Sequence, residues 1–412
     1  RSNGQLFLGP DAPHCDRMTY GMLSPRWPRT LGGLLIATGL WCMAPTAGAQ
    51  SPVWNWARTL DAGNEEYVRD IAVEPVTGNI YVVGAYKSAT AGVAPYGLPA
   101  SAGGSTDAFL AKLDPSGNLI WSRSIGSSQP DAALGVDVAS SGLVVTTGYY
   151  GGTVAGMGLT NTGSSDAFVA AYDASGTFQW VKSIRSNQPD QGTGVAISGN
   201  TVVAYGTFTY QSFLGGVLST LGLTSGQSYA YLNTYDLSGA VQWSLTGVSN
   251  GDILTQRITA DASHAYVVGY TEGSTFSWLN SLGNTSTSAS SSNDDALFCS
   301  AVSLAGTPAW ARMINNPGDA DAGCNGVAVD CAAVYITGNS HNGSVFPGGI
   351  TPSSPGAHDY WFLAALSRST GTTNWVRTAS SSIDHGVNGH DVSVGRNGQI
   401  HVAGSMAGTV TT

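Results

Sequence analysis

Histidines gather in the last fifth of this 412-residue chain, where their side chains could bind a metal. Five of the seven histidines follow residue 340. Imidazole nitrogens and carboxylates are common ligands of zinc and iron. One hypothesis is therefore a zinc or iron site formed by His341, His358, His385 and Asp384. The alternative is solvated loop histidines, which the absence of an H-x-H or H-x-x-x-H pair favours.

Acidic residues recur at regular intervals along the chain, and carboxylates are the usual ligands of calcium. Calcium takes six to eight oxygens, and no D-x-D-x-D loop gathers them locally. The repetition favours a structural role, in which each carboxylate accepts hydrogen bonds from turn amides. We predict no cofactor, with calcium as the open alternative. The acids with a predicted structural role include Asp107, Asp131, Asp166 and Asp190.

Tryptophan is a second residue type that could make ligand contacts, because an exposed indole stacks on sugar rings. Six tryptophans recur 59 to 67 residues apart, and this regular spacing favours packing between repeats. Three others fall outside the series and are the better candidates for ligand contacts. The regular set is Trp56, Trp121, Trp180, Trp243, Trp310 and Trp375, and the candidates are Trp54, Trp278 and Trp361.

Motifs that would indicate a specific reaction are absent from the sequence. It holds no phosphate-binding loop and no H-E-x-x-H pair. Glycoside hydrolysis needs two paired carboxylates, and nothing in the sequence singles out two of the many acids. The sequence therefore disfavours an enzyme.

Two recurring phrases indicate the elements that position these residues. One phrase runs from an Asp-aromatic strand through a Gly turn to a Trp strand, as in DAFLAKLDPSGNLIWSRSIG (107–126) and DAFVAAYDASGTFQWVKSIR (166–185). The other is a hairpin such as GVDVASSGLVVTTG (135–148), with apolar residues alternating around a tight turn. Each unit of about sixty residues thus supplies four short strands.

Repeated four-stranded units predict an all-β protein with the β-propeller fold, because stacked sheets cover each other's apolar faces. A β-helix has much shorter coils, and tandem sandwiches need about seven strands per unit. The opening Trp strand (53–60) is expected to close the ring, and the chain is expected to be truncated. The predicted blades are residues 65–126, 131–185, 190–248, 252–315, 319–380 and an incomplete 384–412.

These phrases, with D-A-F, D-x-S-G, W and V-Y-V-T-G in order, resemble the SBBP (seven-bladed β-propeller) repeat family of bacteria. The resemblance covers residues 53–404 and is most specific in the first two copies. It implies a propeller of a secreted or cell-surface protein. It also implies a C-terminal sorting domain for type IX secretion, which is missing from this sequence. The family contributes no catalytic residues.

The first fifty residues predict export. Residues 1–21 resemble neither a targeting sequence nor part of a folded domain, whereas residues 22–49 resemble a signal peptide. In it, arginines precede a 13-residue apolar run (31–43) and a small-residue cleavage site (47–49). The run is too short to cross a bilayer as a helix, so no transmembrane segment is predicted.

Charge argues against one class of partner, and the cysteine count limits the possible disulfides. The net charge of −10 and the lack of a basic cluster argue against nucleic acid. Beyond residue 49 the cysteines number three, so a complete disulfide framework is excluded. A bridge between Cys299 and Cys324 and buried free thiols are both open, and Cys331 is the third.

These observations predict a secreted, non-catalytic binding, adhesion or scaffold module whose partner is an extracellular protein or a glycan. The alternative is a lectin or a carbohydrate-active enzyme that uses the same face. Loops on a rigid scaffold usually carry recognition. The predicted contact face is formed by the long loops 87–106, 153–165, 210–227 and 340–357.

Overall fold

The structure is a computed structural model, and it describes most of the chain after residue 64. The chain divides into residues 1–57 and a compact unit, Arg58–Thr412, which holds every strand within the described ranges. The described residues are 56–58, 60, 65–209, 213–214, 217–218, 223–280, 285–292, 295–317, 322–352, 359–381, 387–395, 397–407 and 410–411.

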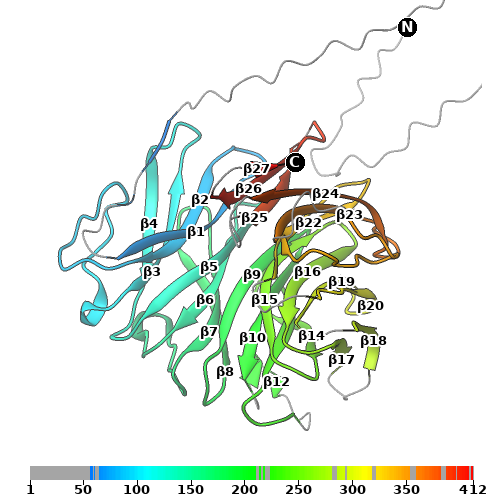
Figure 1. The fold of residues 1–412 in the computed structure, drawn as a ribbon. Helices are drawn as coiled ribbons and strands as arrows, with labels where there is room; N and C mark the ends of the chain where they lie inside the picture. The colour runs from blue at the N-terminus through cyan, green and yellow to red at the C-terminus, as the bar shows by residue number, and fades with distance from the viewer. Residues whose placement is uncertain are drawn as a thin grey trace, which may run out of the picture. The chain divides into compact units, whose positions relative to one another are not determined.

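The described residues form six antiparallel sheets, numbered 1 to 6 in chain order (Figure 1). Sheet 1 holds β1 (Glu66–Val73), β2 (Ile80–Tyr86), β3 (Asp107–Leu113) and β4 (Leu119–Ile125). Sheet 2 holds β5 (Asp131–Val138), β6 (Val144–Tyr150), β7 (Asp166–Tyr172), β8 (Phe178–Arg185), β11 (Phe213–Leu214) and β12 (Val217–Leu218). Sheet 3 holds β9 (Gln191–Ser198), β10 (Thr201–Thr209), β13 (Ser228–Asp236), β14 (Val241–Val248), β17 (Thr275–Leu279) and β18 (Thr285–Ser290).

The second half of the unit repeats this plan. Sheet 4 holds β15 (Ile253–Ala260), β16 (His264–Thr271), β19 (Ala296–Ser303) and β20 (Pro308–Ile314). Sheet 5 holds β21 (Gly323–Val329), β22 (Val334–Ser340), β23 (Tyr360–Leu366), β24 (Thr373–Ser381) and β27 (Val410–Thr411). Sheet 6 holds β25 (Val387–Val394) and β26 (Ile400–Met406), and short 3-10 turns lie at Ala102–Gly104 and Ala155–Met157.

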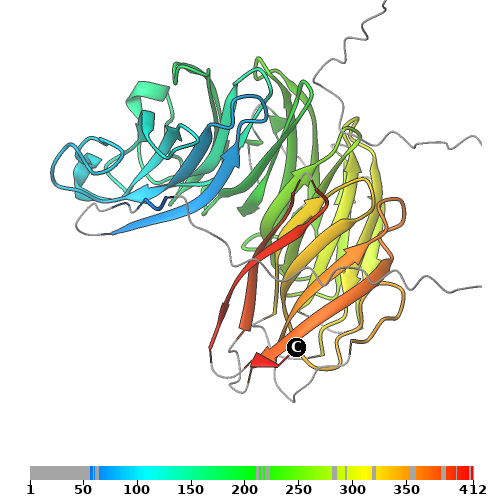
Figure 2. The same ribbon diagram turned by 90° about the horizontal axis from the view of Figure 1, so that it is seen from above.

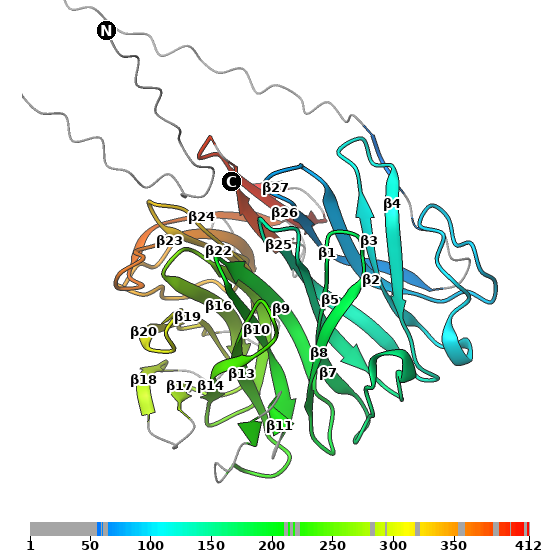
Figure 3. The same cartoon turned by 180° about the vertical axis from the view of Figure 1, so that it is seen from behind.

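The first strand of each sheet faces a common channel. The inner strands β1, β5, β9, β15, β21 and β25 contact one another in this order, and all six line one central cavity. Figures 2 and 3 show the sheets fanning out from these strands. Antiparallel sheets arranged radially around a channel define a β-propeller, so the predicted fold is confirmed.

The D-x-S-G turns explain why the outer hairpins form. The Asp114 side chain accepts hydrogen bonds from the amides of Ser116 (2.9 Å) and Asn118 (2.8 Å). Gly117 follows with φ 80°, a left-handed conformation that glycine adopts without strain. The same sequence pattern therefore closes the hairpin between the third and fourth strands in successive sheets.

Four tryptophans of the regular series tie each sheet to the next. Each indole Nε1 donates to a backbone carbonyl in the outer hairpin turn of the following sheet, with N···O distances of 2.8 to 3.0 Å. Such buried contacts satisfy the polar edge of a large apolar ring. The donor and acceptor pairs are Trp121 with Ala174, Trp180 with Leu237, Trp243 with Leu304 and Trp310 with Arg368.

A glycine in the same turn lies against each of these indoles, and its replacement should destabilise the unit. Gly239 has φ 83°, and a Cβ there would lie 2.7 Å from Trp180. We expect Gly239→Ala to lower the free energy of unfolding by roughly 2 kcal/mol, from backbone strain and overlap together. Denaturant titration measures this loss. Gly226→Ala is the matched control, because Gly226 has φ 84° but no atom within 4 Å. Equal losses in both variants would contradict a specific contact with the indole.

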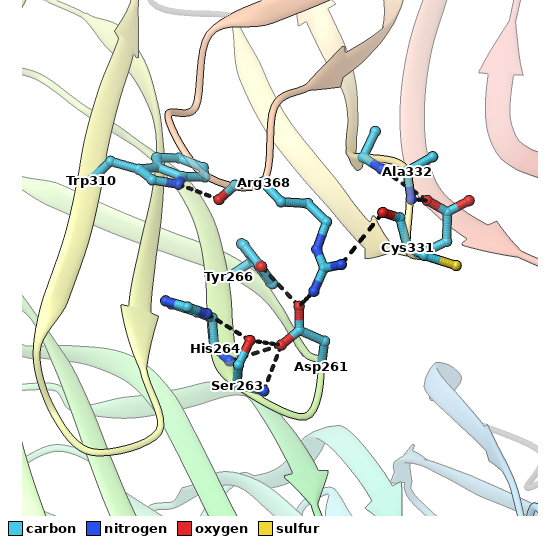
Figure 4. A network of polar contacts seen from close by, with 10 residues as sticks. Asp261, Ser263, His264, Tyr266, Trp310, Cys331, Ala332 and Arg368 are labelled. Carbon is cyan, nitrogen blue, oxygen red and sulfur yellow. Dashed lines mark hydrogen bonds and ion pairs between the residues drawn. The ribbon is translucent and has the colours of Figure 1, made fainter. Parts of the chain in front are cut away.

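An ion pair and its hydrogen bonds join sheets 4 and 5 (Figure 4). The Arg368 guanidinium reaches from the outer turn of sheet 5 to the Asp261 carboxylate in the inner turn of sheet 4. Asp261 also accepts from the amide of Ser263 (2.7 Å), the amide of His264 (2.8 Å) and the hydroxyl of Tyr266 (2.9 Å). Burial raises the pKa of Asp261, but these donors lower it more, so the carboxylate stays ionised.

Some strands differ from the four-strand prediction. The Ser/Thr-rich segment after residue 273 adds the hairpin β17–β18 to the edge of sheet 3. Within the predicted contact loop 210–227, β11 pairs with β8 and β12 pairs with β11. Unpaired strand edges favour such additions, because they satisfy exposed amides and carbonyls.

The expected Trp strand at residues 53–60 is not a strand where it can be described. Trp56, Ala57, Arg58 and Leu60 lie outside every strand, and residues 51–55 are not among the described residues. Arg58 Nε nevertheless donates to the carbonyl of Gly117 at 2.8 Å, as Arg123 Nε does to that of Gly176 at 2.7 Å. Arg58 thus contacts the turn of sheet 1 in the way that Arg123 contacts the turn of sheet 2.

No helix within the described ranges has the length and apolar character needed to cross a membrane.

Candidate functional site

Each inner strand carries a β-bulge at the same position. In every sheet the pairing between the first and second strands skips one residue of the inner strand. A bulge redirects a side chain and is common beside functional sites. The bulge residues differ in every sheet, unlike the tryptophans and turn glycines. They are Arg69, Leu134, Thr193, Gln256, Asn325 and His390.

All six bulge residues line one pocket at the mouth of the channel, which we call the mouth pocket. Its volume is about 720 Å³, within the range of small-molecule sites. Tyr67 and Tyr149 add two aromatic rings, and Gln191 and Asn388 add two amides. The lining comes from all six sheets. The pocket lies where the inner strands begin, which is the end of the sheets that also carries the loops between the second and third strands.

Several polar side chains of the mouth pocket are held in place by hydrogen bonds. Asn325 Nδ2 donates to Asn388 Oδ1 at 2.9 Å, and the hydroxyls of Thr193 and Thr255 lie 2.9 Å apart. Burial raises the pKa of Tyr149 to about 12, so its hydroxyl remains a neutral donor. The pocket therefore offers fixed amide and hydroxyl groups, which suit a polar ligand.

Arg257 separates the mouth pocket from a second cavity farther along the channel. It lines both spaces, and its guanidinium donates to the backbone carbonyls of Arg69 (3.0 Å) and Leu134 (3.3 Å). These carbonyls belong to sheets 1 and 2, whereas Arg257 belongs to sheet 4. The side chain thus crosses the channel and joins the bulges on its far side.

The second cavity, of about 230 Å³, is lined by three carboxylates. Asp70 accepts from the amide of Val136 at 2.9 Å, and Asp137 accepts from that of Ile197 at 2.7 Å. Each bond joins one inner strand to the next. Burial raises the pKa of Asp70 and of the third carboxylate, Asp391, and raises that of Asp137 to about 7.

These carboxylates are suited to joining strands more than to acid–base catalysis. Both oxygens of Asp137 accept backbone amides, from Val138 at 2.8 Å and from Ile197. Glycoside hydrolysis requires two carboxylates free to face a sugar from opposite sides. The arrangement therefore favours binding at the mouth pocket over chemistry in the second cavity.

Close backbone packing explains why three inner strands have glycine directly after the bulge. A Cβ on Gly135 would lie 2.8 Å from Gly194 of the next strand, and one on Gly326 would lie 2.7 Å from Asp391. Asp70, Arg257 and Asp391 occupy this position in the other three strands. Three charged groups of the channel thus stand at positions that glycine occupies in the other strands.

The predicted metal ligands do not form a site in the part of the chain that is described. His341 Nδ1 contacts the carboxylate of Asp359. His358, His385 and Asp384 lie outside the described residues. Within the described ranges, no cluster of three or more His, Cys, Asp or Glu side chains could hold a metal.

The tryptophans predicted to contact a ligand do not line the mouth pocket where they are described. Trp278 is fully buried and donates from Nε1 to Ser300 Oγ at 2.9 Å, so it packs in the core and cannot stack on a sugar. The prediction for Trp278 was therefore wrong, because β17 turns this ring inward. Trp361 is half-buried, with Nε1 2.8 Å from Thr337 Oγ1. Trp54 lies outside the described residues.

The recurring aspartates accept hydrogen bonds from nearby loops. Asp107 accepts from the amide of Ala102 (3.0 Å) and Asp166 from that of Thr162 (2.8 Å). Asp131 accepts from the amide of Gly151 (3.0 Å) and Asp190 from that of Thr209 (3.0 Å). Asp107, Asp131 and Asp166 thus each hold a loop beside their sheet, and Asp190 holds the end of β10.

Cys299, Cys324 and Cys331 form no disulfide within the described part of the chain. Cys299 and Cys324 are buried in one apolar cluster, and Cys331 is exposed. Burial raises the pKa of the Cys299 thiol, which keeps it protonated and unreactive.

Comparison with curated proteins gives two partial likenesses. No family model matches the chain, so no family model supports the SBBP resemblance. The chain is 29% identical over 142 residues to the regulatory protein FlaEY of Caulobacter vibrioides. It is 22% identical over 227 residues to an uncharacterized WD repeat-containing protein, L264, of Acanthamoeba polyphaga mimivirus. The matches cover 33% and 47% of this chain but 15% and 16% of those proteins.

Comparison with solved structures gives distant likenesses. The crystal structure of Sqt1 from Chaetomium thermophilum has a TM-score of 0.37 and 12% identity, over 85% of this chain and 100% of Sqt1. The Dos1 propeller has a TM-score of 0.38 and 8% identity, over 84% of this chain and 68% of Dos1. The propeller assignment rests on the sheets and the channel described above.

The bulge residues were missed at the level of sequence, although a signal was present. The phrases R-D-I-A-V, L-G-V-D-V, T-G-V-A-I, Q-R-I-T-A, N-G-V-A-V and H-D-V-S-V align on their apolar residues. Their first column varies in every copy, whereas the rest of the phrase is largely apolar or small. A position that varies inside a regular repeat is one where the fold does not require a particular residue type.

Proposed function

We propose that this chain is a secreted or cell-surface bacterial β-propeller that acts as a non-catalytic binding or scaffold module. The observation that carries the proposal is the set of six different bulge side chains around the mouth pocket. Repeated residues form the sheets and their junctions, so recognition falls to residues that do not repeat. Export rests on the signal-peptide pattern of residues 22–49.

The partner is an extracellular protein or a glycan, bound at the face where the mouth pocket and the predicted contact loops open. Binding of the full chain to arrays of purified glycans and secreted proteins tests this. Gln191 and Gln256 line the mouth pocket, and we expect Gln191→Ala and Gln256→Ala each to weaken the leading interaction roughly tenfold, the loss of a well-placed hydrogen bond.

Gln179→Ala is the matched control, because Gln179 is exposed on β8, an outer strand of sheet 2. It should leave the affinity unchanged. Equal affinity in all three variants would place the contact elsewhere and overturn the proposal for the mouth pocket.

A carbohydrate-active enzyme is the second candidate, favoured by the three carboxylates of the second cavity. Incubation of the chain with any glycan that it binds distinguishes the two functions. The non-catalytic proposal expects the glycan to be recovered intact. Release of reducing ends that is lost in Asp137→Asn and Asp70→Asn would overturn it in favour of the enzyme.

A further inference from the structure

The formal charges that line the mouth pocket are all positive. Among the described residues they are Arg69 and Arg257, with His390 as a third basic side chain, and no carboxylate joins them. The remainder of the lining is aromatic, amide, hydroxyl or aliphatic. The pocket is thus basic on a chain whose net charge is −10.

The two arginines have different surroundings. Arg257 donates to two backbone carbonyls and lies beside Asp70 and Asp391, which offset its charge. Arg69 is exposed, and its guanidinium lies 4.3 Å from the centre of the Tyr67 ring. No hydrogen bond joins its side chain to another described residue. The charge of Arg69 is therefore the one available to a ligand.

The position of Arg69 suits a carboxylate. The contact with the Tyr67 ring helps to hold the planar guanidinium, and its N–H groups, which no other described residue accepts, can bind both oxygens of a carboxylate. Arg69 is also a bulge residue, so its backbone has already left the ladder of sheet 1. The guanidinium is held before the ligand arrives, which lowers the entropy lost on binding.

The remaining groups suit a sugar. Tyr67 and Tyr149 offer aromatic faces to the C–H faces of a pyranose ring. Gln191, Gln256 and Asn388 offer amides, which both donate to and accept from hydroxyl groups. A long polyanion would be repelled by the acidic chain, whereas a short oligosaccharide can enter the basic pocket.

We propose that the mouth pocket binds a carboxylated sugar, of the hexuronic acid type, with Arg69 paired to the carboxylate and Tyr67 and Tyr149 beside the ring. This inference rests on the proposed function, because it names the ligand class of the same site.

Calorimetric titration of the full chain with trigalacturonate and with its methyl ester tests the charge. The two probes share their rings, and only the first is anionic. We expect trigalacturonate to bind about tenfold more tightly than its methyl ester, the difference expected from one charge-assisted pair. Its affinity should fall as salt is added. Arg69→Gln should abolish the preference without changing the melting temperature.

Arg377→Gln is the matched control, because Arg377 is also exposed and lies 5.8 Å from an aromatic ring, that of Trp375 on an outer strand. It should retain the full preference. Equal binding of acid and ester, or a preference that survives Arg69→Gln, would overturn the inference. A triglutamate peptide that binds in an Arg69-dependent way, where trigalacturonate does not, would overturn it in favour of an acidic peptide.

Failure here can be separated from failure of the proposed function. If neither sugar probe binds but Gln191→Ala still weakens an interaction found on the arrays, the inference about carboxylated sugars is wrong and the binding function stands. If Gln191→Ala and Gln256→Ala also have no effect on that interaction, the mouth pocket is not its site, and both the inference and the proposed role of the mouth pocket are wrong.

Discussion

Between pH 6.0 and pH 8.5 the unit is expected to lose stability as the pH rises, by roughly 2 kcal/mol in total. Burial raises the pKa of Asp137 and of Asp190 to about 7, and that of Asp131 to about 6. Asp190 Oδ2 is also buried without a hydrogen-bond partner among the described residues. In the unfolded chain each carboxyl regains its usual pKa near 3.8.

The sign follows from proton counting. Above pH 6 the unfolded chain has released these protons, whereas the folded chain still holds part of them and must release them as the pH rises through 7. The folded state therefore binds more protons, and stability falls with rising pH. Asp261 and Glu74, whose pKa values are lowered, are ionised in both states over this range and do not contribute.

Thermal unfolding followed by circular dichroism measures the effect, and the range stays above the isoelectric point of about 4.9. We expect the melting temperature to be roughly 3 °C lower at pH 8.5 than at pH 6.0. Asp190→Asn should reduce this difference, because the amide keeps the acceptor used by Thr209 and places its NH2 where an oxygen had no partner. Asp173→Asn, at an exposed turn, should not change it. A melting temperature that is constant or rises with pH would contradict the prediction.

Arg368→Ala should destabilise the junction of sheets 4 and 5 by roughly 2 kcal/mol. Breaking a buried ion pair costs about 3–5 kcal/mol, and the figure is reduced here because the Arg368 side chain is 30% exposed. The change removes the ion pair to Asp261 and the hydrogen bond to the carbonyl of Cys331 (3.4 Å) (Figure 4). It leaves the backbone carbonyl that accepts from Trp310.

Chemical denaturation of the variant measures the loss. Arg312→Ala is the matched control, because Arg312 is half-buried at the same junction and its Nη1 donates to the carbonyl of Ala311. A double-mutant cycle with Asp261→Asn isolates the pair, and we expect a coupling energy of about 1 kcal/mol or more. Additive losses would show that Arg368 acts through packing alone.

The repeat made the fold predictable because its residues make the same contacts in successive copies. Trp180 and Gly239 meet at a junction that recurs between successive sheets from sheet 1 to sheet 5, so the spacing of the tryptophans alone indicated packing between sheets. The D-x-S-G turn is equally local, because Asp114 and Gly117 close it with nearby groups. Features set by a short and repeated segment could be derived from the sequence.

The mouth pocket could not be derived in this way. A bulge is a property of the pairing between two strands, and the sequence around Arg69 does not state which residue leaves the ladder. Trp278 shows the same limit, because its position outside the repeat suggested exposure, whereas an added strand buries it. The convergence of Arg69 and Gln256 depends on the curvature of the whole set of sheets.

A bulge residue contributes little to the ladder that surrounds it, and this has a consequence for evolution. Since each of the six positions sits outside strand pairing, a substitution there changes the surface of the pocket without removing a ladder hydrogen bond. The scaffold can therefore diversify one repeat at a time while its junctions stay constant. Randomising these six positions should yield a library of folded propellers with different ligand preferences.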